Sequence, residues 1–423
     1  MTERDDWRLR LRSWARWKLG VPREALGSLG WDVLAGMCAG VFLGMTMPFL
    51  TRIARAELHA TDFALGVMNA APFVGNLLAP VWARQMEGKA KMPFCQVSWI
   101  TGRSLLLLMP LVATAWGFVG VISLLLFIGT ISSPAYTSLM KDIYPDRARG
   151  KLMSYVRITV QATTFLSTLI TGRLMDRGMG FGPLFAVAGV AGILAALFFA
   201  QVRPLASNAP TTPEPPQSLL HFLRDTLSIL KDNESYRWFA LSVMLYGFGN
   251  LMAWPLYQLY QVEQLHIRPT QIANLTNVTS LCAMLGSLYW GRFLDRHGAA
   301  QTVFRAILLI SSISVVYFFA HSVSLLYIAS FLAGFGMAGI ELSYMASILS
   351  YAEHGKAARY QALHSLLLGI RGVCAPLVAL PLLRQVGYQG LFAVTFLLML
   401  IGAWLQWRAA RSQESQPPVL KQR

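Results

Sequence analysis

Four ionisable residues, Arg103, Arg157, Glu341 and Arg371, lie inside long apolar runs of this chain. A charge within such a run is costly unless it has a partner or a function. Counted at about 1.5 Å per residue from the near ends of their runs, Glu341 lies about 14 Å deep and Arg371 about 18 Å deep. An acid and a base at these depths can form a structural ion pair, or a substrate anion or a proton can compete for one of them.

The two other arginines have different interpretations. Arg157 stands about six residues from the start of its run, so we expect its side chain to reach the membrane surface. For Arg103, a structural bond to backbone carbonyls and a role in transport are both open.

The sequence contains none of the residue patterns of an enzyme. Its seven histidines are scattered without a His-x-x-x-His pair, and no pair of carboxylates lies inside the apolar runs. A Gly-rich phosphate loop is also missing, which argues against direct coupling to ATP. Cys38, Cys95, Cys282 and Cys374 are too widely spaced to indicate a disulfide framework or a metal site. We therefore expect neither catalysis nor a cofactor.

The composition predicts an all-α polytopic membrane protein. Of the 423 residues, 55% are hydrophobic and only 13% are charged, and a soluble domain this apolar would aggregate. Runs of about 20 apolar residues, the length of a transmembrane helix, occur twelve times. The expected spans are residues 31–51, 62–83, 93–116, 118–140, 152–174, 181–202, 236–261, 270–291, 301–320, 323–350, 359–383 and 388–407.

Basic residues predict the orientation, because Lys and Arg in short loops stay on the cytoplasmic side. With both termini cytoplasmic, three of the 36 Lys and Arg residues lie in spans and six on the outer face, which leaves 27 inside. The outer six are Arg52, Arg55, Arg173, Arg177, Arg268 and Arg384. The net charge of +16 thus reflects topology and attraction to anionic lipid, and we expect no nucleic-acid partner. The predicted location is the plasma membrane, with multiple passes.

The chain is organised as two halves and a linker. From Arg203 it turns polar and Pro-rich, which marks a boundary, and an amphipathic helix is expected near the end of this stretch. The first residues are basic with three tryptophans and lack the apolar core of a signal peptide. The predicted segments are an N-terminal surface segment at 1–30, six-helix bundles at 31–202 and 236–407, a linker at 203–235 and a cytoplasmic tail at 408–423.

A short motif occurs in both halves. Trp290-x-Arg292-x-x-Asp295 matches Trp82-x-Arg84-x-x-Glu87, which lies 208 positions earlier. The same shift relates Asn69 to Asn277, Phe127 to Phe335 and Tyr136 to Tyr344, and a shift of 207 relates Pro48 to Pro255. A nearly constant shift across six spans indicates an internal duplication.

The second copy of the motif reads Gly291-Arg292-Phe293-Leu294-Asp295-Arg296-His297-Gly298 and is expected to be a short basic loop. It resembles the loop signature of the major facilitator superfamily of transporters. The first copy, Ala83 to Lys91, keeps the acid and a base but lacks both glycines. The resemblance covers Trp31 to Trp407 and implies two pseudo-symmetric six-helix bundles with a substrate site between them.

By this resemblance, the motif loops and the loop between spans four and five form an inner gate. Gly291 would let a neighbouring helix approach closely, and Asp295 would lie at the start of the fifth span near Lys151. The alternative is that these are ordinary solvated charges. The gate candidates are Gly291, Arg292, Asp295, Arg296, Gly298, Arg84, Glu87, Lys91, Asp142, Arg147 and Arg149.

The resemblance also places spans ten and eleven side by side, where Glu341 and Arg371 can meet. It lines a central cavity with spans one, four, seven and ten, helped by two, five, eight and eleven. Polar and aromatic side chains there can contact a small organic solute, or simply join helices. These candidates are Asn69, Gln161, Tyr246, Asn250, Trp254, Tyr257, Asn277 and Tyr344.

The expected function is secondary active transport of a small organic solute by alternating access, coupled to an ion or proton gradient. The partners would be this solute, a co-transported proton or ion and membrane lipid, with the protein acting as a monomer. A proton-coupled drug exporter is an alternative, although span four lacks the Arg and span five the Gly-Pro pair usual in such exporters. A non-transporting sensor or scaffold is a third possibility.

Overall fold

The computed structural model describes residue 22 and residues 25–86, 89–144, 149–203, 228–231, 233–351 and 357–414. Within these ranges the regular elements are helices, and eight of them are long and apolar enough to cross a membrane. Most of the predicted N-terminal segment, most of the linker and the end of the tail lie outside the described residues. The all-α membrane fold predicted from composition is confirmed.

Two of the eight helices are long enough to cross twice. α12 (Pro269–Phe318) has 50 residues and α14 (Ala357–Glu414) has 58, whereas about 20 residues suffice for one crossing. The second and fifth predicted spans correspond to α4 (Asp62–Leu77) with α5 (Ala79–Met86), and to α8 (Arg149–Asp176), which are not among the eight. This arrangement is consistent with twelve spans.

Packing divides the chain into two compact units. Unit 1 comprises Met1–Pro48, Leu78–Val112 and Leu124–Glu214. Unit 2 comprises Phe49–Leu77, Ala113–Ser123 and Pro215–Arg423. Unit 2 therefore contains, besides the second half of the sequence, two segments of the first half.

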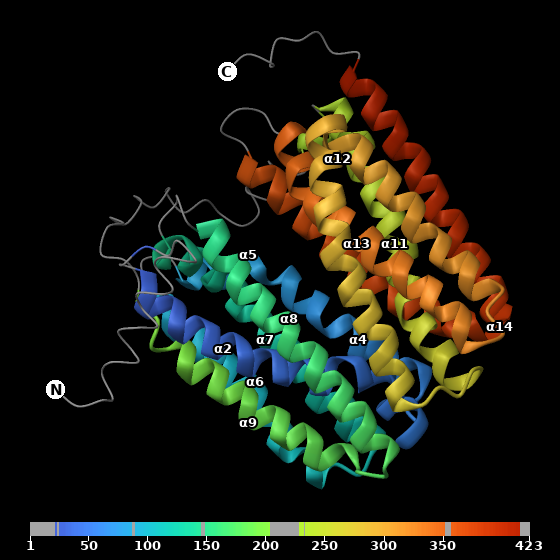
Figure 1. Cartoon of the computed structure of the whole chain (residues 1–423). Coiled ribbons are helices and arrows are strands. Elements are labelled where there is room, and N and C mark those ends of the chain that lie inside the picture. The colour runs from blue at the N-terminus through green and yellow to red at the C-terminus, as the bar shows by residue number, and fades with distance from the viewer. Residues whose placement is uncertain are drawn as a thin grey trace. The chain divides into compact units, whose positions relative to one another are not determined.

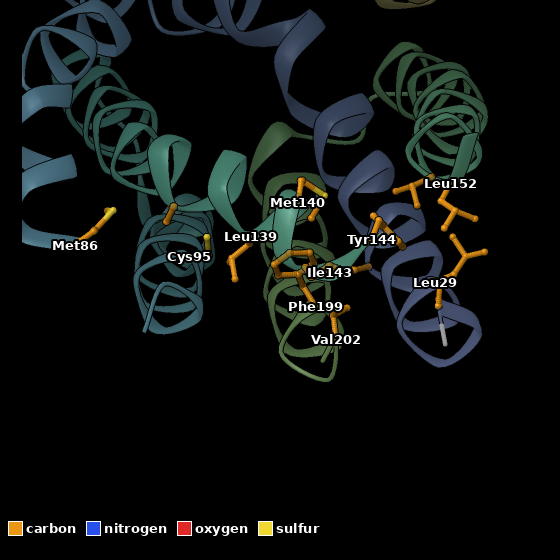
Figure 2. Packing of buried hydrophobic residues seen from close by; sticks show 14 residues of the cluster. Leu29, Met86, Cys95, Leu139, Met140, Ile143, Tyr144, Leu152, Phe199 and Val202 are labelled. Carbon is orange, nitrogen blue, oxygen red and sulfur yellow. The ribbon is translucent and has the colours of Figure 1, made fainter. Parts of the chain in front are cut away.

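Unit 1 is a bundle built around α2 (Leu26–Thr46), which packs on α8 and on α9 (Phe181–Phe199) (Figure 1). α6 (Met92–Ser104) continues as the 3-10 helix η4 (Leu105–Leu111), and both pack on α9. The part of α7 (Ala115–Ile143) from Leu124 onward also belongs to this unit. At one end of the bundle lies an apolar core cluster that includes Leu29, Ile143 and Leu152 (Figure 2).

Small residues let α2 and α8 approach closely. Gly40 and Gly44 lie one turn apart on α2, and a Cβ atom at Gly40 would stand 1.9 Å from Thr163 Oγ1. At Gly44 the same atom would stand 2.1 Å from Ser167 Oγ. The hydroxyl of Ser167 donates to the carbonyl of Gly40 at 3.2 Å, and that of Thr168 to the carbonyl of Gly44 at 3.1 Å. Close backbone approach and interhelical hydrogen bonds are what stabilise helix pairs in lipid, where burial of apolar surface contributes little.

Replacing Gly40 with alanine is expected to destabilise unit 1. The new Cβ would also meet the carbonyl oxygen of Val160 at 2.5 Å, a backbone atom that a side-chain rotation cannot move. Overpacking of this kind costs about 1–3 kcal/mol. Thermal unfolding of the purified protein should show a lower melting temperature. Gly30→Ala on the same helix is the control, because no atom of a described neighbouring element lies within 4 Å of its Cβ position. Equal effects of both changes would contradict this account of the contact.

Unit 2 begins where α2 runs on through η2 (Met47–Phe49), α3 (Leu50–Arg52) and the π-helical turn η3 (Ile53–Glu57). α4 packs on α14. α11 (Glu234–Glu263) packs on α14, and α12 packs on α13 (Val323–Tyr351). The side chain of Asn233 caps α11 by accepting a bond from the amide of Tyr236 at 2.9 Å.

Glycines reverse the chain inside the two longest helices. Gly298 has φ 78° in α12 and Gly387 has φ 68° in α14, a region that glycine adopts without the clash other residues suffer. Residues 291–297, by contrast, are helical. The prediction of a loop over Gly291–Gly298 is therefore wrong for all but its last residue, because the helix of span eight continues until a glycine permits the turn.

Matching local structures in both sequence repeats support the duplication. His59 and His266, 207 positions apart, are the two described non-glycine residues with positive φ, at 52° and 45°. Each follows a helix end, where Ala60 N donates to Ala54 O and Ile267 N to Gln261 O. The motif tryptophans also make matching contacts: Trp82 packs on Phe127 at 6.3 Å between ring centroids, and Trp290 on Phe335 at 5.6 Å.

Candidate functional site

Four charged residues and a tyrosine at the ends of helical segments of unit 2 form a cluster, which we call the Arg55 cluster. Its members are Arg55 in η3, Asp62 at the start of α4, Glu263 at the end of α11, and Arg384 and Tyr388 in α14. Arg55 Nη2 lies 3.0 Å from Asp62 Oδ1, and Arg384 Nε donates to Asp62 Oδ2 at 2.6 Å. Arg55 Nε also donates to Glu263, which accepts a second bond from the Tyr388 hydroxyl.

The Arg55 cluster ties the two sequence repeats together within unit 2. Arg55 and Asp62 belong to the first repeat, whereas Glu263 and Arg384 belong to the second. The Asp62 side chain is only 7% exposed and is held between two guanidinium groups. Nearby, the hydroxyl of Thr51 donates to the side chain of Gln258, again across the repeats. Such polar contacts are strong when formed, yet they can be exchanged for water without rearranging a packed core.

A second cluster surrounds Arg371, which is 4% exposed in α14. Its Nη1 donates to the carbonyl of Val243 in α11. The guanidinium interacts electrostatically with Tyr246 of α11, Tyr344 of α13 and His364 of α14. The rings of Tyr344 and His364 meet edge to face, with centroids 5.1 Å apart. We call these residues, with Gly247, the Arg371 cluster.

The predicted ion pair between Glu341 and Arg371 is not among the four ion pairs found in the described part of the chain. Glu341 is exposed, whereas Arg371 is buried against α11. Pairing of the two residues in another conformation stays a prediction. Arg157 is exposed in α8.

Arg103 adopts the structural alternative considered from the sequence. Its Nη1 donates to the carbonyl of Gly192 at 2.7 Å. The guanidinium also lies over the rings of Trp99 and Phe42, at 4.9 and 5.1 Å from their centroids. A carbonyl and two aromatic faces are the kinds of group that stabilise a buried cation without an acid.

The polar and aromatic candidates differ in their surroundings. Tyr257 is buried in unit 2, where its hydroxyl lies 2.6 Å from that of Ser314 and its ring stacks on Tyr317 at 4.3 Å. Asn69 donates to the carbonyl of Leu65 in its own helix at 2.8 Å. Both therefore make contacts of a structural kind in this conformation.

Four other candidates differ in how far they are exposed. Trp254 is 48% exposed and Gln161 is also exposed, whereas Asn250 is partly buried and Asn277 is 4% exposed. Tyr246 and Tyr344 are brought together at Arg371. A role in binding stays a prediction for all of these residues.

The second copy of the motif forms the end of a packed helix in unit 2. Trp290 is 2% exposed and donates to the carbonyl of Phe335 at 2.8 Å, while Phe293 stacks on His297 at 4.1 Å. Asp295 and Arg296 are exposed, and Arg292 bonds back to Leu288 O at 3.4 Å. Their gate role stays a prediction.

The role expected for Gly291 stays a prediction. Among the described residues, no atom of a neighbouring element lies within 4 Å of its Cβ position. A close approach lies earlier in α12, at Gly286, whose Cβ position is 3.1 Å from Phe335 Cα.

Several gate candidates of the first repeat cannot be placed. Glu87 and Arg147 lie outside the described residues, as do the side chains of Arg84, Asp142 and Arg149. Lys91 is partly buried just before α6.

Asp32 in α2 is a buried acid that the sequence reasoning missed. It is 3% exposed and accepts a hydrogen bond from the Tyr144 hydroxyl at 2.6 Å. Figure 2 shows Tyr144 in the apolar cluster with Leu29 and Leu152. The signal was an acid at the first turn of an apolar run, which is easily taken for a surface residue at the edge of the membrane.

Comparisons with known proteins agree with this architecture. The chain resembles the nucleoside transporter NupG (TM-score 0.72, 12% identity, covering 90% of this chain and 99% of NupG). It also resembles a bacterial homologue of the human lysosomal transporter Spinster (0.65, 14%, 94% and 100%). A third similar structure is the human organic anion transporter MFSD10 (0.62, 17%, 91% and 100%). At these identities the likeness shows the fold alone.

Sequence comparison gives the family. No curated protein matches the chain. The family model described as Major Facilitator Superfamily matches twice, over residues 33–239 and 239–422, one match for each repeat. The two matches together cover nearly the whole sequence, and the chain therefore belongs to the Major Facilitator Superfamily of membrane transporters.

Proposed function

We propose that this protein is a secondary active transporter that moves a small organic solute across the membrane by alternating access. The observation that carries this proposal is the Arg55 cluster, in which two residues of one repeat are tied to three of the other. A carrier of this kind must close each side of its solute path in turn. The cluster has the properties of such a closure, because its ion pairs join the repeats at the ends of helices.

The predicted orientation places the Arg55 cluster on the outer side of the membrane, since Arg55 and Arg384 belong to the outer set. With these contacts formed, the outer side is closed. The motif residues around Asp295 would supply the corresponding closure on the cytoplasmic side. A gradient of protons or another ion would drive the cycle, and Glu341, an acid within a span, is a candidate for the coupling group.

The solute class follows from the site and not from the similar structures. Those structures are named for a nucleoside transporter and an organic anion transporter, so they point to different solutes. Polar and aromatic side chains such as Tyr246 and Tyr344 are suited to a small organic molecule with both polar and apolar parts.

Uptake into proteoliposomes tests this function. The full chain is reconstituted and offered labelled nucleosides, sugars, amino acids and organic acids, with a proton or sodium gradient imposed or absent. We expect at least one solute to accumulate only when a gradient is present. Failure of every solute to exceed uptake by protein-free vesicles would contradict transport, and binding without uptake would indicate a sensor or scaffold.

The same vesicles separate the drug-exporter alternative. Loading them with a fluorescent cationic drug and imposing a proton gradient should give no more efflux than protein-free vesicles. Proton-driven efflux of the drug would favour the exporter, despite the missing Arg in span four.

A further inference from the structure

Among the residues that the structure describes, Arg371 is a buried cation without a carboxylate partner. The four ion pairs of the described residues involve Arg52, Arg55 and Arg384, and none involves Arg371. At 4% exposure the guanidinium also lacks full hydration. A charge removed from water is stabilised by opposite charge, by many hydrogen bonds or by aromatic faces, and among the described residues no aromatic face lies over the Arg371 guanidinium. Arg371 therefore has an unmet requirement for negative charge in this conformation.

The groups around Arg371 supply hydrogen-bond donors in excess of acceptors. A guanidinium carries five N–H donors, and the described bond uses one of them, to the carbonyl of Val243. The Tyr344 hydroxyl lies beside the Arg371 guanidinium, and apart from this contact Arg371 Nε and Tyr344 Oη are buried without a hydrogen-bond partner among the described residues. Ser347 Oγ, one turn from Tyr344 on α13, is in the same condition. A carboxylate or phosphate, which offers only acceptors when ionised, matches this set.

The helix backbone leaves room for the guanidinium. Gly247 lies one turn after Val243 on α11, and a Cβ atom there would stand 1.8 Å from Arg371 Nη1. Any residue other than glycine would displace the arginine. His364, two turns before Arg371 on α14, lies against Tyr344 and adds a group that can donate a hydrogen bond. None of the described residues that define the Arg371 cluster is an acid.

We infer that the transported solute is an organic anion and that Arg371 binds its carboxylate or phosphate group. That the anion is transported rests on the proposed function. That Arg371 binds an anion does not. Tyr344 and Ser347 donate further hydrogen bonds to the same group. The guanidinium and the anion neutralise each other, so the loaded protein carries no uncompensated charge at this depth.

Ligand-induced thermal stabilisation of the purified full chain tests the anion site. The probes are matched pairs that differ in charge: benzoate and benzamide, nicotinate and nicotinamide, glucose 6-phosphate and glucose. We expect at least one anion to raise the melting temperature while its neutral partner at equal concentration does not. Arg371→Gln should weaken that anion at least about tenfold, and Arg371→Lys should weaken it less.

Two further variants keep the test decisive. Arg305→Gln removes the same charge from an exposed position of unit 2 that stacks on Phe293, and it should leave anion binding unchanged. If Arg371→Gln does not fold, Gly247→Ala, which displaces the guanidinium but keeps its charge, should show the loss instead. Equal stabilisation by charged and neutral partners in every pair would overturn the proposal, as would full anion affinity in Arg371→Gln or Gly247→Ala.

Two more arms separate the sources and the functions. Stabilisation by short-chain phosphatidylglycerol, without any effect of the soluble anions, would identify a lipid headgroup and overturn a solute site. An anion that binds through Arg371 but is not taken up by proteoliposomes would support the site and contradict transport. Undiminished uptake of a neutral solute by Arg371→Gln would support transport and contradict the anion site.

Discussion

Replacing Asp62 with lysine is expected to lower solute uptake by about tenfold or more and to leave the outer side of the protein open. The Asp62 carboxylate lies between Arg55 and Arg384, at 3.0 and 2.6 Å. A lysine there would put three cations together in place of two ion pairs. Because Asp62 is 7% exposed, solvent would screen this repulsion only in part.

The free-energy cost of Asp62→Lys depends on how exposed its partners Arg55 and Arg384 are. Breaking a fully buried ion pair costs about 3–5 kcal/mol, but Arg384 is 70% exposed and Arg55 25% exposed. A cost of about 1–3 kcal/mol is therefore reasonable, which shifts the balance between closed and open states by about 5- to 150-fold. Asp62→Asn, which removes the attraction without adding repulsion, should fall between the wild type and Asp62→Lys.

The measurements are uptake into proteoliposomes and the labelling rate of a single cysteine introduced at Asn69, with a reagent that cannot cross the membrane. Glu57→Lys is the matched control. It breaks an ion pair of similar geometry, Arg52 with Glu57 at 3.1 Å, that lies within one segment and joins no repeats. Equal losses in both variants would mean that the Arg55 cluster has no special part in closure.

Cross-linking Thr51 to Gln258 is expected to abolish transport almost completely. The side chains of these residues are hydrogen-bonded across the repeats, so cysteines at both positions lie within reach of a short bifunctional methanethiosulfonate reagent. A covalent tie would hold the outer side closed and prevent the solute path from opening there. Reduction of the link should restore uptake.

This experiment needs a background without the native free cysteines, Cys38, Cys95, Cys282 and Cys374. The pair Arg52→Cys and Glu57→Cys gives a control link with the same chemistry inside one segment. That link should leave most of the uptake intact. Transport that continues through a quantitatively formed Thr51–Gln258 link would rule out movement between these two helix ends.

Much of the fold was predictable because it depends on simple patterns. The apolar runs gave the helices, and the shift of 207–208 positions gave the repeats that appear as matching turns at His59 and His266. The turns at Gly298 and Gly387 were harder to predict from the sequence. A helix can continue through polar residues such as Asp295 once it leaves the membrane, so the end of an apolar run is not the end of its helix.

The site was less predictable. Arg55 and Arg384 were interpreted only as indicators of orientation, because nothing in a single sequence shows which outer charges meet. Asp62 to Arg384 spans 322 positions. Arg371 was identified because a charge in an apolar run is conspicuous, but its lack of an acidic partner depends on the packing of α11 against α14. Gly40 and Gly44 in α2 are visible in the sequence as glycines four apart, but this spacing alone does not identify α8 as the helix that packs against them.

The most direct test of the account is the distance between the helix ends that the Arg55 cluster joins. Spin labels at Ala56 and Gln264, which are both exposed, would report this distance by pulsed electron resonance in lipid nanodiscs. We predict a short distance for most molecules at rest and a second population at a longer distance. This population should increase in the presence of a transported solute and should dominate in Asp62→Lys. A single short distance under all of these conditions would contradict alternating access through this end of the protein.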